Sequence, residues 1–165
     1  MEIYLVRHAA AEERLASRPD AERRLTAEGR EDFAAGVRGL RALGLRPDRL
    51  LTSPLVRARE TARILAAGLE APEPEPEREL GPGGSAEDLL ASLRGAGEQV
   101  VLVGHQPDLG RLLLLAVTGR AGDGAPLKKG GVARLDFAGA PRPGAGVLHW
   151  LLTPKQLRRL GRSEG

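Results

Sequence analysis

Three short apolar runs constrain the fold of this 165-residue chain most strongly. They lie at residues 3–6, 50–52 and 99–103, and each is followed by a polar cluster and then by a helical pattern. Strands that are apolar on both faces and alternate with helices are typical of a parallel sheet that is covered on both sides. The order therefore predicts a three-layer α/β sandwich with a mostly parallel central sheet, built as one domain over residues 1–165.

Four helices are expected around these runs. Thr26 is expected to cap the first helix, which runs to about residue 43. Ser53 and Pro54 have the pattern of an N-cap and first turn for the second helix, which runs to about residue 67. Ser85 begins the third helix, which ends near residue 95, and Pro107 begins the fourth.

The remaining segments are expected to complete the sheet and its connections. Alternating proline over residues 72–77 forbids helix and favours an extended surface connection. Two further strand-like runs, at residues 132–137 and 147–152, lie between stretches rich in glycine and proline. We expect both runs to be edge strands.

Composition excludes several classes of function. The chain has no cysteine, which excludes a disulfide framework, thiolate metal sites and a cysteine nucleophile. Only three of its 25 cationic residues are lysine, and arginine prefers planar recognition of phosphate or carboxylate. The arginine excess indicates either an anionic partner or a GC-rich or heat-adapted source. Nucleic acid is not the expected partner, because aromatic residues make up 2% of the chain and leave little surface for base stacking.

The distribution of apolar residues favours a cytoplasmic protein that does not enter a membrane. No apolar run approaches the roughly 20 residues that are needed to cross a bilayer. Residues 1–4 begin a strand-like pattern and do not have the basic and then apolar order of a signal peptide.

Four side chains follow the expected strands at the edge where α/β sheets bind ligands. Arg7 and His8 end the first strand, Arg57 follows the second and His105 follows the third. Arg57 lies in the first turn of its helix, where a cation opposes the helix dipole unless an anion lies between them. Each residue taken singly could be a surface cation or a structural histidine. Together they predict a pocket of phosphate size.

The residues around these positions carry a family resemblance. The segments 5–9 (LVRHA), 52–62 (TSPLVRARETA) and 103–107 (VGHQP) resemble the three signature blocks of the histidine phosphatase (phosphoglycerate-mutase-like) superfamily. The block 25–29 (LTAEG) and the short length resemble its SixA-type phosphohistidine phosphatase branch. The resemblance implies a phosphoglycerate-mutase-like fold. Ala9 is a departure, because the family motif usually has glycine there.

The resemblance also implies a role for each site residue. His8 would take the phosphoryl group, while Arg7, Arg57 and His105 would bind its oxygens and the substrate. Guanidinium and imidazolium donors can stabilise the transition state of phosphoryl transfer, and the phosphohistidine is then hydrolysed by water. No Asp, Glu and His cluster with metal-ligand spacing lies nearby in the sequence, so we expect neither a metal nor a cofactor.

Two candidate residues rest on weaker signals. Glu79 follows the proline-rich connection and is the best positional candidate for a general acid, although it could equally be a solvated loop carboxylate. Arg18 is a candidate substrate-binding residue at the mouth of the pocket, with a solvated surface cation as the alternative.

These features favour a phosphatase that removes phosphate from a phosphohistidine on a partner protein. The chain has no insertion large enough to form a lid, so a protein surface could approach the pocket. One alternative is a broad-specificity phosphomonoesterase that acts on small phosphorylated metabolites with Glu79 as its acid. The other is a module that binds phosphate or phosphoprotein without turnover. The sequence leaves the oligomeric state open.

Overall fold

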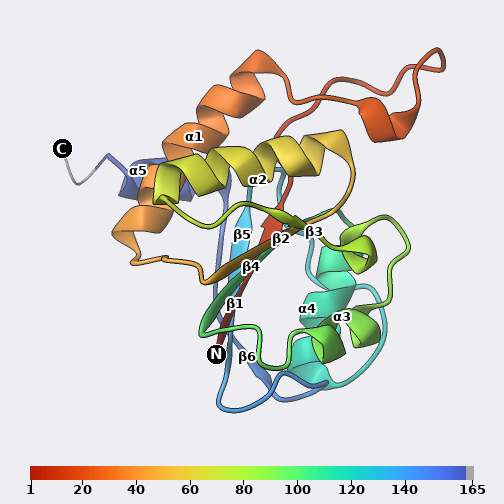
Figure 1. Ribbon diagram of the computed structural model, residues 1–165, viewed down its shortest axis with the longest axis vertical. Helices are drawn as coiled ribbons and strands as arrows, with labels where there is room; N and C mark the ends of the chain where they lie inside the picture. The colour runs from red at the N-terminus through yellow and green to blue at the C-terminus, as the bar shows by residue number, and fades with distance from the viewer. Residues whose placement is uncertain (163–165) are drawn as a thin grey trace.

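The sheet is mostly parallel, as the sequence predicted, and it has six strands, one more than the five apolar runs indicated (Figure 1). The computed structural model describes residues 1–162 of the chain. The strand order is β3-β2-β4-β1-β5-β6, in which β1 to β4 run parallel to one another and β5 and β6 run antiparallel to their neighbours. The strands are β1 (Glu2–Arg7), β2 (Arg49–Thr52), β3 (Glu75–Pro76), β4 (Gln99–Gly104), β5 (Val132–Phe137) and β6 (Gly146–Leu152).

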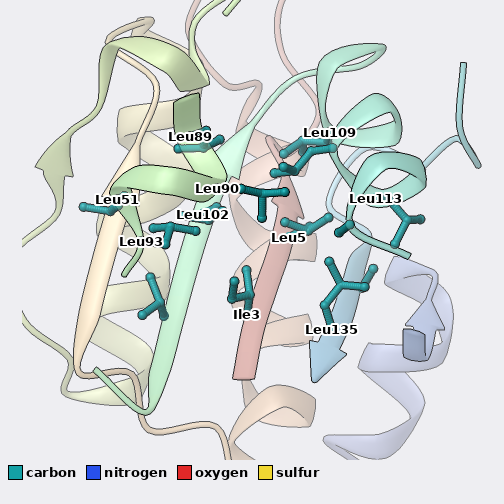
Figure 2. Packing of buried hydrophobic residues seen from close by; sticks show 14 of the residues in the cluster. Ile3, Leu5, Leu51, Leu89, Leu90, Leu93, Leu102, Leu109, Leu113 and Leu135 are labelled. Atoms are coloured by element: carbon teal, nitrogen blue, oxygen red, sulfur yellow. The ribbon is translucent and has the colours of Figure 1, made fainter. Parts of the chain in front are cut away.

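Helices cover both faces of the sheet and make the three layers. The face that includes Tyr4 and Val6 packs against α1, α2 and α5. The opposite face, which includes Ile3 and Leu5, packs against α3 and α4 (Figure 2). Neighbouring residues of β1 belong to different cores because side chains alternate across a strand. The helices are α1 (Ala27–Ala42), α2 (Val56–Leu69), α3 (Ala86–Ser92), α4 (Asp108–Thr118) and α5 (Pro154–Leu160), with 3₁₀ turns η1 (Asp20–Glu22) and η2 (Arg78–Leu80).

The sequence signals for three of the helix starts are confirmed. The side chain of Thr26 accepts a hydrogen bond from the amide of Gly29 and caps α1. Ser85 caps α3 in the same way, by accepting from the amide of Asp88. Pro107 is the residue that precedes α4.

The predicted start of α2 is wrong by about two residues. The helix begins at Val56 with Leu55 at its N-cap, and it has no side-chain cap. Ser53 does not cap α2 because its hydroxyl lies 2.7 Å from Nε2 of His105. The hydroxyl oxygen also accepts a weak hydrogen bond from the amide of Leu55 at 3.3 Å. The apparent capping serine thus belongs to the site described below.

The prediction of two edge strands near the C-terminus is half wrong. Of these two strands, β6 is an edge strand and β5 is not, because β5 pairs with β1 on one side and β6 on the other. The other edge is the short strand β3, formed within the proline-rich connection. Residues 154–160 form α5, a helix that the sequence analysis did not predict. Its residue Leu157 packs into the core beneath α1.

The parallel strands β1, β2 and β4 direct the residues that follow them to one edge of the sheet. The amide of His8 donates to the carbonyl of Gly104 at 3.0 Å, and the amide of Ser53 donates to that of Val103 at 2.9 Å. No helix in the described residues is both long and apolar enough to cross a membrane.

Candidate functional site

Two histidines and an arginine from three separate segments are buried at the carboxyl edge of the sheet. His8 follows β1, His105 follows β4 and Arg57 lies in the first turn of α2, and each is no more than 6% exposed. The ring centres of the two histidines are 5.1 Å apart, with the ring planes tilted by 54°. The structure therefore brings together the histidines that the sequence analysis singled out.

The ring of His8 is oriented by its own neighbour in the chain. Nδ1 of His8 lies 2.7 Å from the carbonyl oxygen of Ala9. A carbonyl oxygen can only accept, so Nδ1 must carry the proton, and Nε2 of the neutral ring has a free electron pair. The amide of Ala9 in turn donates to Oγ1 of Thr61 in α2 at 3.0 Å. This bond positions Ala9, whose carbonyl oxygen fixes the tautomer of His8.

A buried serine fixes the second ring. Ser53 is fully buried, and its hydroxyl proton has one acceptor among the described residues, Nε2 of His105. With Nε2 as acceptor, the proton of the neutral His105 ring is on Nδ1. That nitrogen is buried and has no hydrogen-bond partner within residues 1–162. His105 thus presents an unpaired donor.

The terminal nitrogen atoms of Arg7 and Arg57 donate to backbone carbonyls. Nη1 of Arg7 donates to the carbonyl of Leu127 at 2.8 Å, and Nη1 of Arg57 donates to the carbonyl of Asp20, also at 2.8 Å. Nε of each arginine is buried and finds no acceptor in the described part of the chain. Leaving a buried donor unpaired costs about 1–3 kcal/mol, so polar atoms of this kind need an explanation. An anion bound between them would provide the acceptors.

Asp20 is part of the site, and the sequence analysis missed it. Its Oδ2 lies 3.0 Å from Nη2 of Arg57, and its Oδ1 accepts from Nε of Arg23 at 2.9 Å. Burial acts to raise the pKa of Asp20, but the charges of Arg57 and Arg23 outweigh it and lower that pKa. Pro19 indicates that a turn begins near Asp20, but nothing in the sequence predicts that this turn packs against α2.

Burial makes both histidines weak bases. It lowers the pKa of His8 to about 4, and the positive charges of Arg57 and Arg7 act in the same direction. Burial lowers the pKa of His105 to about 3, and the positive charge of Arg57 acts in the same direction. The sequence analysis treated His105 as an imidazolium, whereas burial among cations favours the neutral ring in the unliganded site.

The two lowered pKa values predict a loss of stability in mild acid. An unfolded histidine has a pKa near 6.5, so the unfolded chain takes up protons below that pH while the folded rings stay neutral. The stability that depends on the two neutral rings is fully present above pH 6.5. It is lost as the pH falls toward the pKa values of about 4 and 3 that the rings have in the folded protein. Between pH 7 and pH 5 we expect the free energy of unfolding to fall by about 2 kcal/mol for each ring.

Urea unfolding at the two pH values measures this effect. The variants His8→Gln and His105→Gln should each lose about 2 kcal/mol less than the wild type. His149→Gln is the matched control, because His149 is half exposed and lies on the edge strand β6. Equal pH dependence in all four proteins would contradict the assignment.

Glu79 and Arg18 lie in different surroundings. Glu79 is half-buried in η2 and lines a pocket of about 300 Å³ whose wall also includes His105. Its Oε2 accepts from the amide of Ser85 at 2.7 Å. Arg18 is exposed, and its Nη1 pairs with Oε2 of Glu12 at 2.6 Å. Glu79 therefore lines the same pocket as His105. Arg18 contacts Glu12 and none of the other candidate site residues.

Comparison with known proteins decides the family. A family model described as the histidine phosphatase superfamily (branch 1) matches residues 3–81. An uncharacterized protein of Picosynechococcus is 40% identical over 164 residues, which cover 95% of this chain and 99% of the relative. The chain belongs to the histidine phosphatase superfamily. The sequence prediction of the family is thereby confirmed, and membership supports a phosphatase activity.

Solved structures of other phosphatases share the whole fold. The protein histidine phosphatase SixA, solved in complex with tungstate, has a TM-score of 0.84 at 25% identity, covering 95% of this chain and 99% of that one. The alpha-ribazole phosphatase from Shigella flexneri has a TM-score of 0.69 at 20% identity, covering 93% and 97%. The predicted phosphoglycerate-mutase-like fold is confirmed. The names of these two proteins specify different substrates, so the fold alone does not decide the substrate of this chain.

No group of three or more His, Cys, Asp or Glu residues that could hold a metal ion occurs within residues 1–162. The donors available to a ligand at this site are nitrogen atoms of arginine and histidine. Nitrogen donors of this kind suit an oxyanion.

Proposed function

We propose that this protein is a metal-independent phosphatase that takes a phosphoryl group onto His8 and acts on phosphohistidine in a partner protein. The observation that carries the proposal is the hydrogen bond from Nδ1 of His8 to the carbonyl of Ala9. It leaves Nε2 as a free nucleophile near half-buried Arg7 and buried Arg57, whose charges act on the ring. A buried neutral imidazole among donors for an oxyanion is suited to attack on phosphorus.

The reaction has two steps. In the first, the electron pair on Nε2 of His8 forms a bond to phosphorus, and the bond from phosphorus to the leaving nitrogen of the substrate breaks. The substrate ring takes a proton from solvent on its other nitrogen before the bond breaks, so it leaves as neutral imidazole with the electron pair of the broken bond. In the second, water attacks the phosphohistidine in line, His8 regains its neutral form and inorganic phosphate leaves. The low pKa of His8 keeps the nucleophile unprotonated at neutral pH.

The remaining residues stabilise charge. Nε of Arg7, Nε of Arg57 and Nδ1 of His105 are buried donors that phosphoryl oxygens could accept from. Negative charge on those oxygens favours the protonated form of His105 and raises its pKa, because it offsets the positive charge of the neighbouring arginines. Asp20 holds Arg57 at Nη1 and Nη2, so Nε of Arg57 remains as the donor for substrate. Fixed donors of this kind need no reorganisation during the reaction.

Two considerations favour phosphohistidine over a phosphate ester. This chain is similar over nearly its whole length to the protein histidine phosphatase SixA, whose ligand tungstate is a tetrahedral oxyanion. An imidazole leaving group is much less basic than an alkoxide and can be protonated before it departs, so it has less need of a general acid. Phosphomonoesterase activity remains the second candidate because Glu79 lines the same pocket as His105.

A direct comparison of substrates tests the proposal. The protein should be incubated with a phosphohistidine-carrying phosphotransfer domain and with a panel of sugar phosphates and nucleotides. We expect the higher kcat/KM on the phosphohistidine domain. Faster turnover of the small esters would remove the preference for a bond between phosphorus and nitrogen.

Replacing Glu79 with glutamine separates the two candidate functions. We expect little change in kcat on the phosphohistidine domain. A role for Glu79 as general acid predicts instead a loss of about 10²–10⁴-fold on phosphate esters. Glu77→Gln is the matched control, because Glu77 is in the same loop and is also half-buried. A large loss on phosphohistidine in Glu79→Gln alone would contradict the proposal.

A further inference from the structure

All three lysines of the chain line one groove. Lys128 and Lys129 lie in the loop before β5, and Lys155 is the second residue of α5. These segments and α1 line a groove of about 560 Å³, and its lining also includes Phe33 and Pro154. The helices α1 and α5 lie side by side there (Figure 1). The fold therefore gathers the lysines, which are three of 25 cations, at one place.

The groove adjoins the nucleophile. Its wall includes Ala9 and Ala10, the two residues that follow His8 in the chain. The amide of Gly130 donates to the carbonyls of both Arg7 and His8, each at 3.1 Å. Gly130 has φ +73°, a backbone conformation that other residues rarely adopt, so the turn favours glycine. The loop that carries two of the lysines is thus fixed to the backbone of the site.

Cations outnumber carboxylates in the described lining of the groove. The three lysines are exposed, and none forms an ion pair with another described residue. The fourth cation of the lining, Arg158, pairs with Asp32 at 3.1 Å. The remaining carboxylate in the wall is Glu28, which leaves an excess of cations.

The arginines that form ion pairs behave differently. Typical pairs within the described residues join Arg30 to Glu60 and Arg49 to Glu75, at 2.7 Å and 2.6 Å. Their charge is balanced within the protein. The lysine groove is instead a place where positive charge is open to a partner.

We propose that this groove docks an acidic segment of the phosphorylated protein whose phosphoryl group passes to His8. The inference rests on the proposed function in one respect, which is that the substrate is a protein. Lysine suits such a segment because its ammonium group is a point charge on a flexible stem and needs no fixed geometry. Complementary charge beside a site chiefly affects encounter and binding, so the groove acts on KM.

Peptides that differ in one feature test the groove. Two peptides carry the same phosphohistidine, flanked by aspartates in one and by asparagines in the other. At low salt we expect the wild type to have a KM about ten-fold lower for the aspartate peptide, with similar kcat values. Added salt should remove most of the difference because the charges are exposed. The variant with Lys128→Gln, Lys129→Gln and Lys155→Gln should lose the preference and keep its kcat/KM on p-nitrophenyl phosphate.

A control variant loses the same charge elsewhere. Arg94, Arg120 and Arg142 are exposed, and they lie in segments at the opposite end of the sheet, where the parallel strands begin. Replacing all three with glutamine should leave the preference intact. A preference that survives in the lysine variant, or that disappears equally in both variants, would overturn the proposal.

Two further measurements separate this inference from the proposed function. The same peptide pair made with phosphoserine shows whether the groove acts when the phosphohistidine activity is absent. Fluorescence anisotropy of a labelled, unphosphorylated aspartate peptide reads binding without any turnover. We expect the peptide to bind the wild type about ten-fold more tightly than the lysine variant at low salt. Equal binding would contradict docking, whatever the substrate proves to be.

Discussion

His8→Asn is expected to lower kcat/KM on any phosphorylated substrate by about 10⁴-fold or more, because removal of a covalent nucleophile removes both chemical steps. Asparagine can still donate to the carbonyl of Ala9 but offers no basic nitrogen. Steady-state turnover of the phosphohistidine domain and of p-nitrophenyl phosphate measures the loss.

The control for this variant is His149→Asn. His149 is the third histidine of the chain, is half exposed, and lies 3.2 Å from a carboxylate oxygen of Asp136. We expect it to keep full activity. Thermal unfolding at pH 7 should show that both variants fold. Activity within ten-fold of wild type in a folded His8→Asn protein would remove His8 from the mechanism.

Arg57→Lys is expected to lower kcat by about 10²–10³-fold, the loss that follows removal of one donor to a transition state. Lysine keeps the charge but has no Nε group in a planar fork, so it cannot contact both Asp20 and a phosphoryl oxygen as arginine does. The loss should appear in kcat more than in KM, because the charge on the oxygens develops in the transition state. Steady-state kinetics on the phosphohistidine domain separates the two constants.

Arg59→Lys is the matched control, since Arg59 is on the same helix two residues later and is exposed. We expect kcat for this variant to be within two-fold of wild type. If Arg57→Lys also kept its kcat, the buried guanidinium would have a structural role only.

The fold was predictable where each residue pattern had one interpretation. The apolar runs that became β1, β2 and β4 are buried on both faces, so their continuous hydrophobicity indicates a parallel sheet. Because parallel strands end at one edge, Arg7, His8 and His105 could be placed together from the sequence. The prediction that β5 is an edge strand was wrong, because β5 pairs on both sides. The sequence of a strand does not show which other strands pair with it.

The parts that sequence reasoning missed depend on contacts between distant segments. Asp20 contacts Arg57 across 37 residues, and η1 has no apolar pattern that would place it. Ser53 has the pattern of a helix cap but bonds to a histidine 52 residues away. The lysine groove joins residues near 30, 128 and 155, which the sequence offers no reason to group. Local patterns predict elements well, whereas such pairings follow from tertiary packing.

The most direct test of the central claim is to trap the phosphorylated enzyme. The protein should be mixed briefly with a phosphohistidine domain, quenched in alkali to preserve phosphohistidine, digested and examined by mass spectrometry. We predict a phosphoryl group on the peptide that contains His8 and on that residue. A wild-type protein that releases phosphate with no adduct on His8 would contradict the mechanism, and one that neither releases phosphate nor forms an adduct would be a binding module.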